Sequence, residues 1–594
     1  MKHGKLFKTL TALLAGAMLL ATGCTPAKSS STGTASGGDK TSSTEEKAYY
    51  NKTGYPICDT TLKLTAANSF SSTAKNFKQI TTATKENMAQ LKYYAEHLGL
   101  EFTVDNYTSD AWATTLTNLI AADTLPDMVF GPKDFKLSDA NKYGEQGFIL
   151  DMMQYKDLLP NLLAVNEKYP DLLAVSQTSD GKLYATGALA NPFTADATYR
   201  TFLNKKYIDN LQIEIPKTID EYTAMLKRFR DEDADGDGDK TNEVPLDYKY
   251  CSNMTDRLLL GAFGVTSHSS TFPLHEGDDG KVTMLDDHYK EFLRYLTMLY
   301  EEGLMDKNAF SISNEESTAQ IAADKVGAYA HWAPFVAYST DSTEDVNIAY
   351  GYMSLSSQYN GNQQLVVLTS AVSDTVRVFI SAKTQYPEAC VRFYDFLFTE
   401  DGNTSVSTGV PTQISADLYE VKHDAQLGLD FFQGNTDKIP AAYEKNWDGY
   451  RSAEIVMNGT MKIADIPYDG AQFPNSFEPL IKFFKSNPSA DAEKTVLTDW
   501  NQEALRAKAI AYTDAKTVNE YPTMNYGDDT TRRSQLKTDI TSAITDAKST
   551  VIIGGTANFD ANWQKMVDSV NGMGVEELLK IEQTHYDAYK ANLK

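Results

Sequence analysis

The chain has 594 residues, of which 42% are hydrophobic and 23% are charged, so it is long enough for several average domains or one large two-lobed unit. Its formal net charge of −25 argues against nucleic acid and anionic lipid surfaces as partners. It has only four cysteines, which excludes a disulfide scaffold.

The amino terminus has the features of a secretory signal. Three lysines precede the apolar run Leu10–Ala21, which is shorter than the roughly 20 apolar residues that span a bilayer. Small residues then lead to Cys24, an order that resembles the bacterial lipobox. We therefore expect residues 1–23 to be a signal peptide and Cys24 to be lipidated. An ordinary cleaved signal followed by an incidental cysteine is the alternative.

Residues 24–56 are expected to form the lipidated end and a flexible tether. From Thr25 to about Tyr50 the chain is rich in Ser, Thr, Gly, Lys and Glu and has no apolar pattern, so it cannot bury enough surface to fold. A flexible coil of about 25 residues reaches roughly 25–30 Å. The expected location is the extracellular face of the cell membrane.

Strands and helices alternate in the segment that follows. The expected elements are a strand, a helix, a strand, a helix and a strand, at Thr61–Ala67, Lys85–Leu98 (closed by Gly99), Phe102–Val104, Trp112–Ile120 and Asp127–Phe130. This order predicts a parallel sheet, whose ligands bind beyond the carboxyl ends of the strands. Asn68 lies at such an end and Asp127 lies at the start of the last strand. Both strand-end residues are candidate ligand contacts, with a structural role as the alternative for each.

A second α/β lobe is expected to begin near residue 191. The strand Thr201–Asn204 precedes a helix with a capping box, formed by Thr218 at the N-cap and Glu221 at the third helical position. This pattern predicts a helix that begins directly after Thr218.

An apolar strand near Arg377–Ser381 suggests that the chain returns to the first lobe. In the helix that follows, Cys390 shares the i, i+3, i+4 and i+7 spacing of one apolar face with Phe393, Tyr394 and Leu397. Cys390 is therefore predicted to be a buried thiol and not a nucleophile.

Six segments resemble, in their order along the chain, extracellular solute-binding protein family 1, and especially its larger sugar-binding lipoproteins from Gram-positive bacteria. They are TLPD at 124–127, YGEQGFILD at 143–151, DGKLY at 180–184, residues 202–222, residues 381–397 and the carboxyl-terminal residues 553–579. The resemblance implies two α/β lobes with a periplasmic-binding-protein-like fold, joined by a hinge, that close on a sugar in the cleft between them.

The resemblance also implies the domain organisation. Lobe 1 is expected at residues 57–190 with 376–412 returning to it, and lobe 2 at residues 191–375 with 413–594 mostly adding to it. The implied function is that of a monomeric substrate-binding lipoprotein, which captures a carbohydrate, an oligosaccharide in our reading, for the permease subunits of an ABC importer.

The flat faces of aromatic rings suit sugar rings, so two tryptophans are candidate ligand contacts. Trp332 follows the apolar strand Val326–Ala330, and Trp447 lies in a loop. Trp112 and Trp563 lie in helical patterns and are predicted to belong to the core.

The acidic segment Asp231–Glu243, DEDADGDGDKTNE, is the strongest local motif. Alternating carboxylates on a tight loop can direct six to eight oxygens at one calcium ion. The segment approximates the EF-hand pattern and resembles the calcium loop of the family with one extra residue. The implied ligands of a structural calcium ion are the side chains of Asp233, Asp235 and Asp237, the backbone carbonyl of Asp239, and Glu243 with Asn242. A solvated acidic turn is the alternative.

Enzyme signatures are missing from the sequence, which has no G-x-S-x-G elbow, no H-E-x-x-H and no Walker loop. We therefore expect no catalysis. A surface-anchored glycan-active enzyme and a glycan-binding adhesin without transport are the alternative functions.

Overall fold

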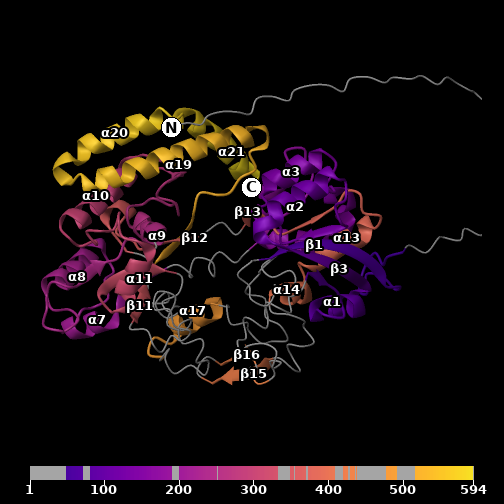
Figure 1. Ribbon diagram of the computed structural model, residues 1–594, viewed down its shortest axis with the longest axis horizontal. Helices are drawn as coiled ribbons and strands as arrows, with labels where there is room; N and C mark the ends of the chain where they lie inside the picture. Colours follow the sequence, from indigo (N-terminus) through magenta and orange to yellow (C-terminus); the bar gives the residue numbers. More distant parts are fainter. Residues whose placement is uncertain are drawn as a thin grey trace, which may run out of the picture. The chain divides into compact units, whose positions relative to one another are not determined.

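The computed structural model describes residues 49–70, 81–189, 200–250, 252–331, 348–352, 355–368, 372–407, 419–425, 428–434, 437, 477–490 and 515–592 (Figure 1). Their buried apolar residues form two large clusters. The lobe 1 core lies between Ile57 and Leu189 and between Val372 and Val406. The lobe 2 core lies between Leu203 and Leu355 and between Met524 and Tyr586. The predicted two-lobed α/β fold is confirmed.

The central sheet of lobe 1 has five strands in the order β14-β4-β1-β3-β2. β1 (Leu62–Phe70) pairs in parallel with both β3 (Leu100–Thr108) and β4 (Met128–Phe130). α2 (Ser109–Ala121) connects β3 to β4, and its Trp112 is 1% exposed. The predicted parallel β-α-β-α-β unit and the core position of Trp112 are confirmed.

The helix between β1 and β3 is shorter than predicted. It consists of α1 (Ala89–Tyr93) and the π-helical turn η2 (Tyr94–Leu98). Residues 85–87 form a separate turn, in which the Asn87 side chain accepts a hydrogen bond from the backbone amide of Thr84 at 2.8 Å. The helix begins only after this turn because the backbone of Met88 is extended, with φ −135° and ψ 117°.

Gly99 ends this helix as predicted. Its φ is 68°, and an added Cβ would lie 2.0 Å from the carbonyl oxygen of Cys58. Both the left-handed backbone and the close approach require glycine at this position.

Two antiparallel strands complete the lobe 1 sheet. β2 (Thr82–Ala83) pairs with β3, and β14 (Val378–Ile380) pairs with β4. α13 (Pro387–Phe396) follows β14, and its Cys390 is fully buried, as predicted. The other lobe 1 helices are α3 (Leu137–Glu145), η3 (Met152–Leu158), α4 (Pro160–Lys168), α5 (Asp171–Ser176) and α14 (Glu400–Ser407).

The lobe 2 sheet has four strands in the order β11-β6-β10-β7. β6 (Arg200–Asn204) is antiparallel to β10 (Val326–His331) and β11 (Ile348–Tyr352), whereas β7 (Val244–Leu246) is parallel to β10. The sheet is therefore mixed. The helices around it are α7 (Lys205–Leu211), α8 (Ile219–Asp231), α9 (Ser252–Ala262), α10 (Asp287–Glu301), α11 (Asn314–Ala322) and η5 (Gln358–Asn360).

The capping box of α8 is present as predicted. The Thr218 hydroxyl accepts from the Glu221 amide at 3.1 Å, and the Glu221 carboxylate accepts from the Thr218 amide at 3.1 Å. Two backbone donors that the helix cannot satisfy are thus bonded.

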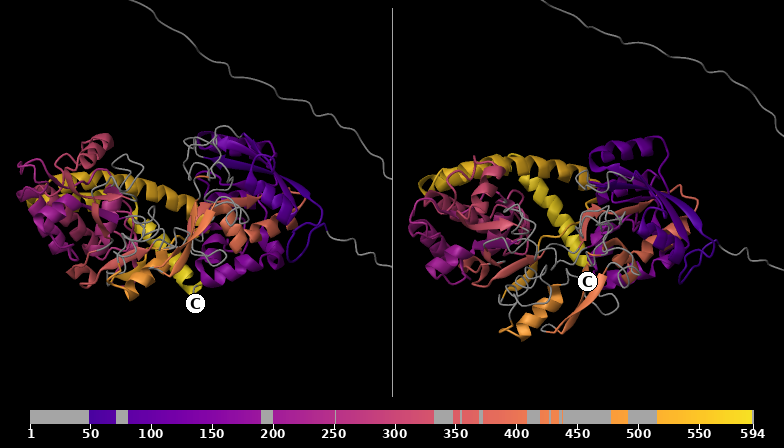
Figure 2. Two further views of the ribbon diagram at one scale, coloured as in Figure 1. Left: turned by 90° about the horizontal axis from the view of Figure 1, so that it is seen from below. Right: turned by 60° about the horizontal axis from the view of Figure 1, so that its bottom comes forward.

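The carboxyl-terminal helices are α19 (Thr530–Ile553), α20 (Phe559–Asn571) and α21 (Val575–Asn592). They contact one another, and two of them, α19 and α20, pack against α10 (Figures 1 and 2). Trp563 on α20 is 7% exposed, which confirms its predicted place in the core.

Small two-stranded sheets make up the other described strands. They are β5 (Gly187–Leu189) with β13 (Val372–Val376), β12 (Leu365–Leu368) with β17 (Lys516–Asn519), β15 (Tyr419–Asp424) with β16 (Leu429–Gly434), and β8 (His275–Glu276) with β9 (Val282–Thr283). The short helices α17 (Phe477–Ser486), η9 (Gly527–Asp529) and η10 (Thr556–Asn558) complete the list. Among the described helices, none combines the length and the apolar character needed to cross a membrane.

Candidate functional site

The acidic loop between α8 and β7 is shaped by hydrogen bonds between its carboxylates and its own backbone. The Asp235 carboxylate accepts from the Asp237 amide at 3.0 Å, and the Asp237 carboxylate accepts from the Asp239 amide at 2.7 Å. Gly236 and Gly238 have φ values of 72° and 92°, which residues with a side chain rarely adopt. The alternation of acidic residues and glycines therefore produces a tight loop.

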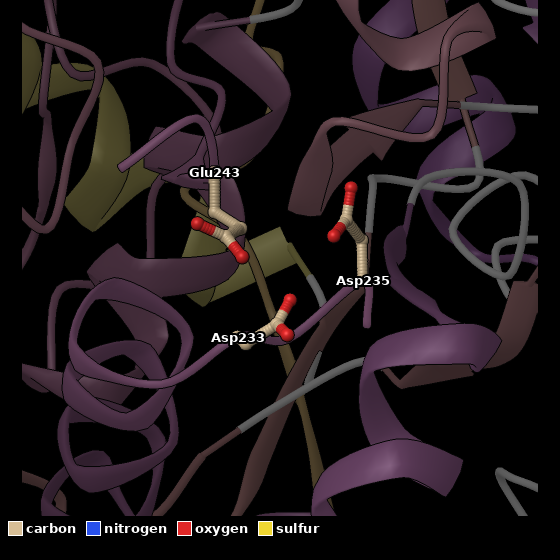
Figure 3. A group of neighbouring side chains, drawn as sticks. All are labelled: Asp233, Asp235 and Glu243. Carbon is tan, nitrogen blue, oxygen red and sulfur yellow. The ribbon is translucent and has the colours of Figure 1, made fainter. Parts of the chain in front are cut away.

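Three carboxylates of this loop point toward one another (Figure 3). Asp233, Asp235 and Glu243 each offer one oxygen, and these atoms all lie within 4.8 Å of one another. Buried oxygens of Asp233 (Oδ1) and Glu243 (Oε2) have no hydrogen-bond partner among the described residues. Because buried carboxylate oxygens without a partner are costly, this arrangement favours a bound cation.

The chemistry of the group fits a hard cation, since its donors are all oxygens. Tyr207 is fully buried beside the loop, and burial together with the charges of Glu243 and Asp235 raises its pKa. The phenol therefore stays neutral and cannot add to the negative charge. The three carboxylates could hold a metal ion.

The other three predicted ligands adjoin this group. The Asp237 carboxylate also accepts from Asn242 Nδ2 at 2.7 Å, and a hydrogen bond from the Asp239 amide holds the pKa of Asp237 below its usual value. The Asp239 carboxylate accepts from the Thr241 amide at 3.0 Å. Asn242 Oδ1 is buried without a partner among the described residues. The metal-ligand roles of Asp237, Asp239 and Asn242 stay predictions.

Asn68 and Asp127 both bond to neighbouring strands of lobe 1. Asn68 is 1% exposed and donates to Asn106 Oδ1 at 2.9 Å. The Asp127 carboxylate accepts from the Thr65 amide and from Thr384 Oγ1, each at 2.8 Å. These bonds give both residues a structural role, and their contact with a ligand stays a prediction.

The other predicted site residues lie outside the described part of the chain. They are Trp332, Trp447 and the lipid-anchor cysteine, Cys24. Their roles stay predictions.

A cavity of about 460 Å³ is lined by residues from both lobes. Lobe 1 contributes Lys136, Asn141 and Asp374, and lobe 2 contributes the segments 267–269 and 520–526 and the first turns of α19. Buried Asn141 Oδ1 has no hydrogen-bond partner among the described residues. The wall thus presents charged, amide and hydroxyl groups that could bind a small polar molecule.

Two ionic networks form the lobe 2 side of this cavity. His268 Nδ1 lies 2.7 Å from Glu520 Oε2. Glu582 is fully buried and accepts from Arg533 Nε at 2.8 Å and from Tyr526 at 2.6 Å. Burial and the nearby Glu582 charge raise the pKa of Tyr526.

Sequence reasoning missed both networks, because each joins residues that are far apart in the chain. No regular spacing of residues in the sequence identifies either network. The family resemblance implied only that the carboxyl-terminal segment adds to lobe 2.

Comparisons with known proteins agree on one family. A model of the bacterial extracellular solute-binding protein family matches residues 72–404. The fructooligosaccharide ABC transporter substrate-binding protein FusA of Streptococcus pneumoniae is 22% identical over 517 residues, which cover 84% of this chain and 87% of FusA.

Solved structures share the fold at low sequence identity. The HMO-binding solute-binding protein of Bifidobacterium longum infantis is 18% identical with a TM-score of 0.63, and the match covers 89% of this chain and 99% of that chain. The FusA EF-hand mutant from S. pneumoniae, in complex with fructo-nystose, is 19% identical with a TM-score of 0.60, over 89% and 100% of the two chains.

Proposed function

We propose that this chain, which belongs to the bacterial extracellular solute-binding protein family, captures an oligosaccharide between its two lobes. It then delivers the oligosaccharide to an ABC importer. The observation that carries this proposal is the pair of separate α/β cores with a cavity lined by residues of both. Two similar proteins are named for fructooligosaccharide and HMO binding, which supports a carbohydrate as the ligand. Capture requires no catalytic group.

Calorimetry with purified protein and a panel of oligosaccharides, beginning with fructo-nystose, tests this function. We expect saturable binding and chemically unchanged sugar after long incubation. Cleaved sugar would favour a glycan-active enzyme. Binding without import in cells that contain the permease would favour an adhesin.

We propose Trp332, Trp447, Asn68 and Asp127 as sugar contacts, with Trp332 as the main aromatic platform. Trp332→Ala should then weaken the affinity for the sugar strongly and leave the melting temperature of the free protein nearly unchanged. Trp563→Ala is the matched control, because truncating this core residue should cost roughly 3–5 kcal/mol of stability. An early-melting Trp332→Ala protein with normal affinity would remove Trp332 from the site.

We propose that the acidic loop binds one structural calcium ion through Asp233, Asp235 and Glu243, with Asp237, Asp239 and Asn242 contributing further oxygens. A ligand that binds only the folded state stabilises it by RT ln(1 + [L]/Kd). Chelation of calcium-loaded protein should therefore lower its melting temperature, and Asp235→Ala should reproduce the loss. Asp231→Ala is the control, because Asp231 is engaged by Arg230 at 2.7 Å outside the group. A chelator without effect on metal-loaded protein would refute a structural role.

We propose that a lipid on Cys24 holds the protein at the outer face of the membrane. Cys24→Ser should move the protein from the membrane fraction to the medium or block its maturation. Unchanged fractionation would show that Cys24 is not the anchor.

A further inference from the structure

The segment Tyr49–Pro56, which precedes the lobe 1 core, is bound to α13. Arg392 of this helix is 3% exposed and donates from Nη2 to the Gly54 carbonyl at 2.6 Å. Its Nε donates to the Asn51 carbonyl at 3.3 Å. A buried guanidinium therefore takes its backbone acceptors from the segment.

The alternative acceptor for Arg392 is already occupied. Asp395 is fully buried, and its carboxylate accepts from Asn161 Nδ2 at 2.7 Å and from the Leu162 amide at 2.9 Å. It lies 4.0 Å from Arg392 Nη1, too far for a direct hydrogen bond. Without the segment, the Arg392 guanidinium would lose acceptors that nothing else on α13 replaces, so the contact is strongly favoured.

Aromatic contacts hold both ends of the segment. The Tyr49 hydroxyl donates to Glu388 at 2.5 Å, and its ring lies 5.7 Å from that of Tyr386. The Tyr55 ring lies edge-on to Phe396 at 5.5 Å. All three partners belong to α13 or to the residue before it.

The segment is also braced internally. Asn51 donates from its amide to the Ile57 carbonyl at 2.7 Å and from Nδ2 to Asp59 at 2.8 Å. Ile57 is fully buried and donates to the Leu98 carbonyl at 2.8 Å. These bonds hold the segment in a compact conformation between α13 and the lobe 1 core.

We propose that Tyr49–Pro56 is a clip that fixes, on α13 of lobe 1, the point at which the tether leaves the folded protein. A pull from the membrane then acts on α13 and not on β1, which follows only a few residues later. Lobe 1 thereby carries the attachment to the tether. This inference rests on the proposed anchored import function, but the clip itself can be tested without it.

Amide hydrogen exchange on the full mature chain tests the clip. Peptides that cover residues 49–57 should exchange about tenfold or more slowly than peptides from residues 25–45. Arg392→Met should abolish this protection. Lys52→Ala is the matched control in the same segment, because Lys52 is largely exposed and reaches Asp157 only at 4.0 Å. Equal exchange of the two regions in the unmodified protein would overturn the proposal.

A second variant distinguishes loss of the clip from misfolding of lobe 1. Tyr49→Phe removes one hydroxyl from a residue that is 41% exposed, and it should raise exchange at residues 49–51 without altering β1. Unchanged exchange in this correctly folded variant would count against the clip.

Transport measurements test whether the attachment of the tether at α13 matters for import. The Arg392→Met protein should bind sugar with a Kd within about twofold of the unmodified protein, because the contacts of the clip lie within lobe 1. Its import rate in cells should fall by about threefold or more. Normal import by a variant with lost protection would overturn the role of the clip. The membrane fractionation of the Cys24→Ser protein tests the lipid anchor by itself, so a failure of the anchor can be distinguished from a failure of the clip.

Discussion

Cys390 illustrates how packing determines the chemistry of a single residue. Its thiol is fully buried on α13 and lies 3.8 Å from Thr384 Oγ1. Burial raises the pKa of Cys390 from 9.0 to about 12. Since the thiolate is the nucleophile, this cysteine should be inert in the folded protein.

We predict that Cys390 resists alkylation by iodoacetamide at pH 8 until the protein is unfolded. Cys58 should behave alike, because burial raises its pKa to about 11. Peptide mapping of native and denatured samples measures the labelling of each thiol separately. Rapid labelling of native Cys390 would contradict its burial.

The same shift predicts a dependence of stability on pH. The unfolded chain loses the Cys390 proton near pH 9.0, whereas the folded chain keeps it until about pH 12. Deprotonation then favours the unfolded state, so this thiol makes the free energy of unfolding fall as the pH rises through that window. Denaturant titrations of Cys390→Ala and the unmodified protein should show a shallower fall for the variant.

At the scale of elements, α19 is joined to lobe 2 by a buried ion pair. Lys548 is 8% exposed and Asp256 is 2% exposed, and Lys548 Nζ donates to the Asp256 carboxylate and to Ser270 Oγ. Asp256 also accepts from Tyr248. The pair determines where α19 sits, because either charge alone would be buried without a counterion.

We predict that Lys548→Ala lowers the free energy of unfolding by roughly 3–5 kcal/mol, because it leaves the Asp256 charge uncompensated. Lys565→Ala, at an exposed position on α20, is the control and should change stability by less than about 0.5 kcal/mol. Urea denaturation measures both. A loss of stability as small as that of the control would mean that the ion pair makes no net contribution to the free energy of unfolding. In the double variant Lys548→Ala/Asp256→Asn, part of the lost stability should be recovered.

At the scale of the whole molecule, two hydrogen bonds link the carboxyl-terminal segment to lobe 1. The Tyr589 hydroxyl donates to Asp171 at 2.9 Å, and Asn525 donates to the carbonyl of Gln177 at 2.5 Å. Asp171 begins α5, and Gln177 follows its last residue. These bonds favour one arrangement of the lobes over others.

We predict that Tyr589→Phe broadens the distribution of distances between spin labels placed on the two lobes. Loss of one hydrogen bond worth about 0.5–1.5 kcal/mol changes the ratio of two lobe arrangements about two- to tenfold. Tyr586→Phe is the matched control, because the Tyr586 hydroxyl bonds to Glu276 within lobe 2. Identical distributions for all three proteins would show that the Tyr589 contact does not restrain the lobes.

Features encoded by neighbouring residues were predictable from the sequence. The alternation of strands and helices up to Phe130, the capping box at Thr218 and the buried face at Cys390 all follow from spacing within a few turns. The family segments extended this to two lobes and a solute-binding role. The acidic residues of the Asp231–Glu243 loop also predicted a group of carboxylates that could hold a metal ion.

Features that join distant residues were determined only by the tertiary structure. Spacing could not show that oxygens of Asp233, Asp235 and Glu243 come within 4.8 Å of one another. Spacing also could not predict that β14 pairs with β4, that His268 contacts Glu520, or that Tyr49–Pro56 binds Arg392. The physical reason is that periodicity records which face of an element is buried, whereas the partner on that face is selected by the packing of the whole chain.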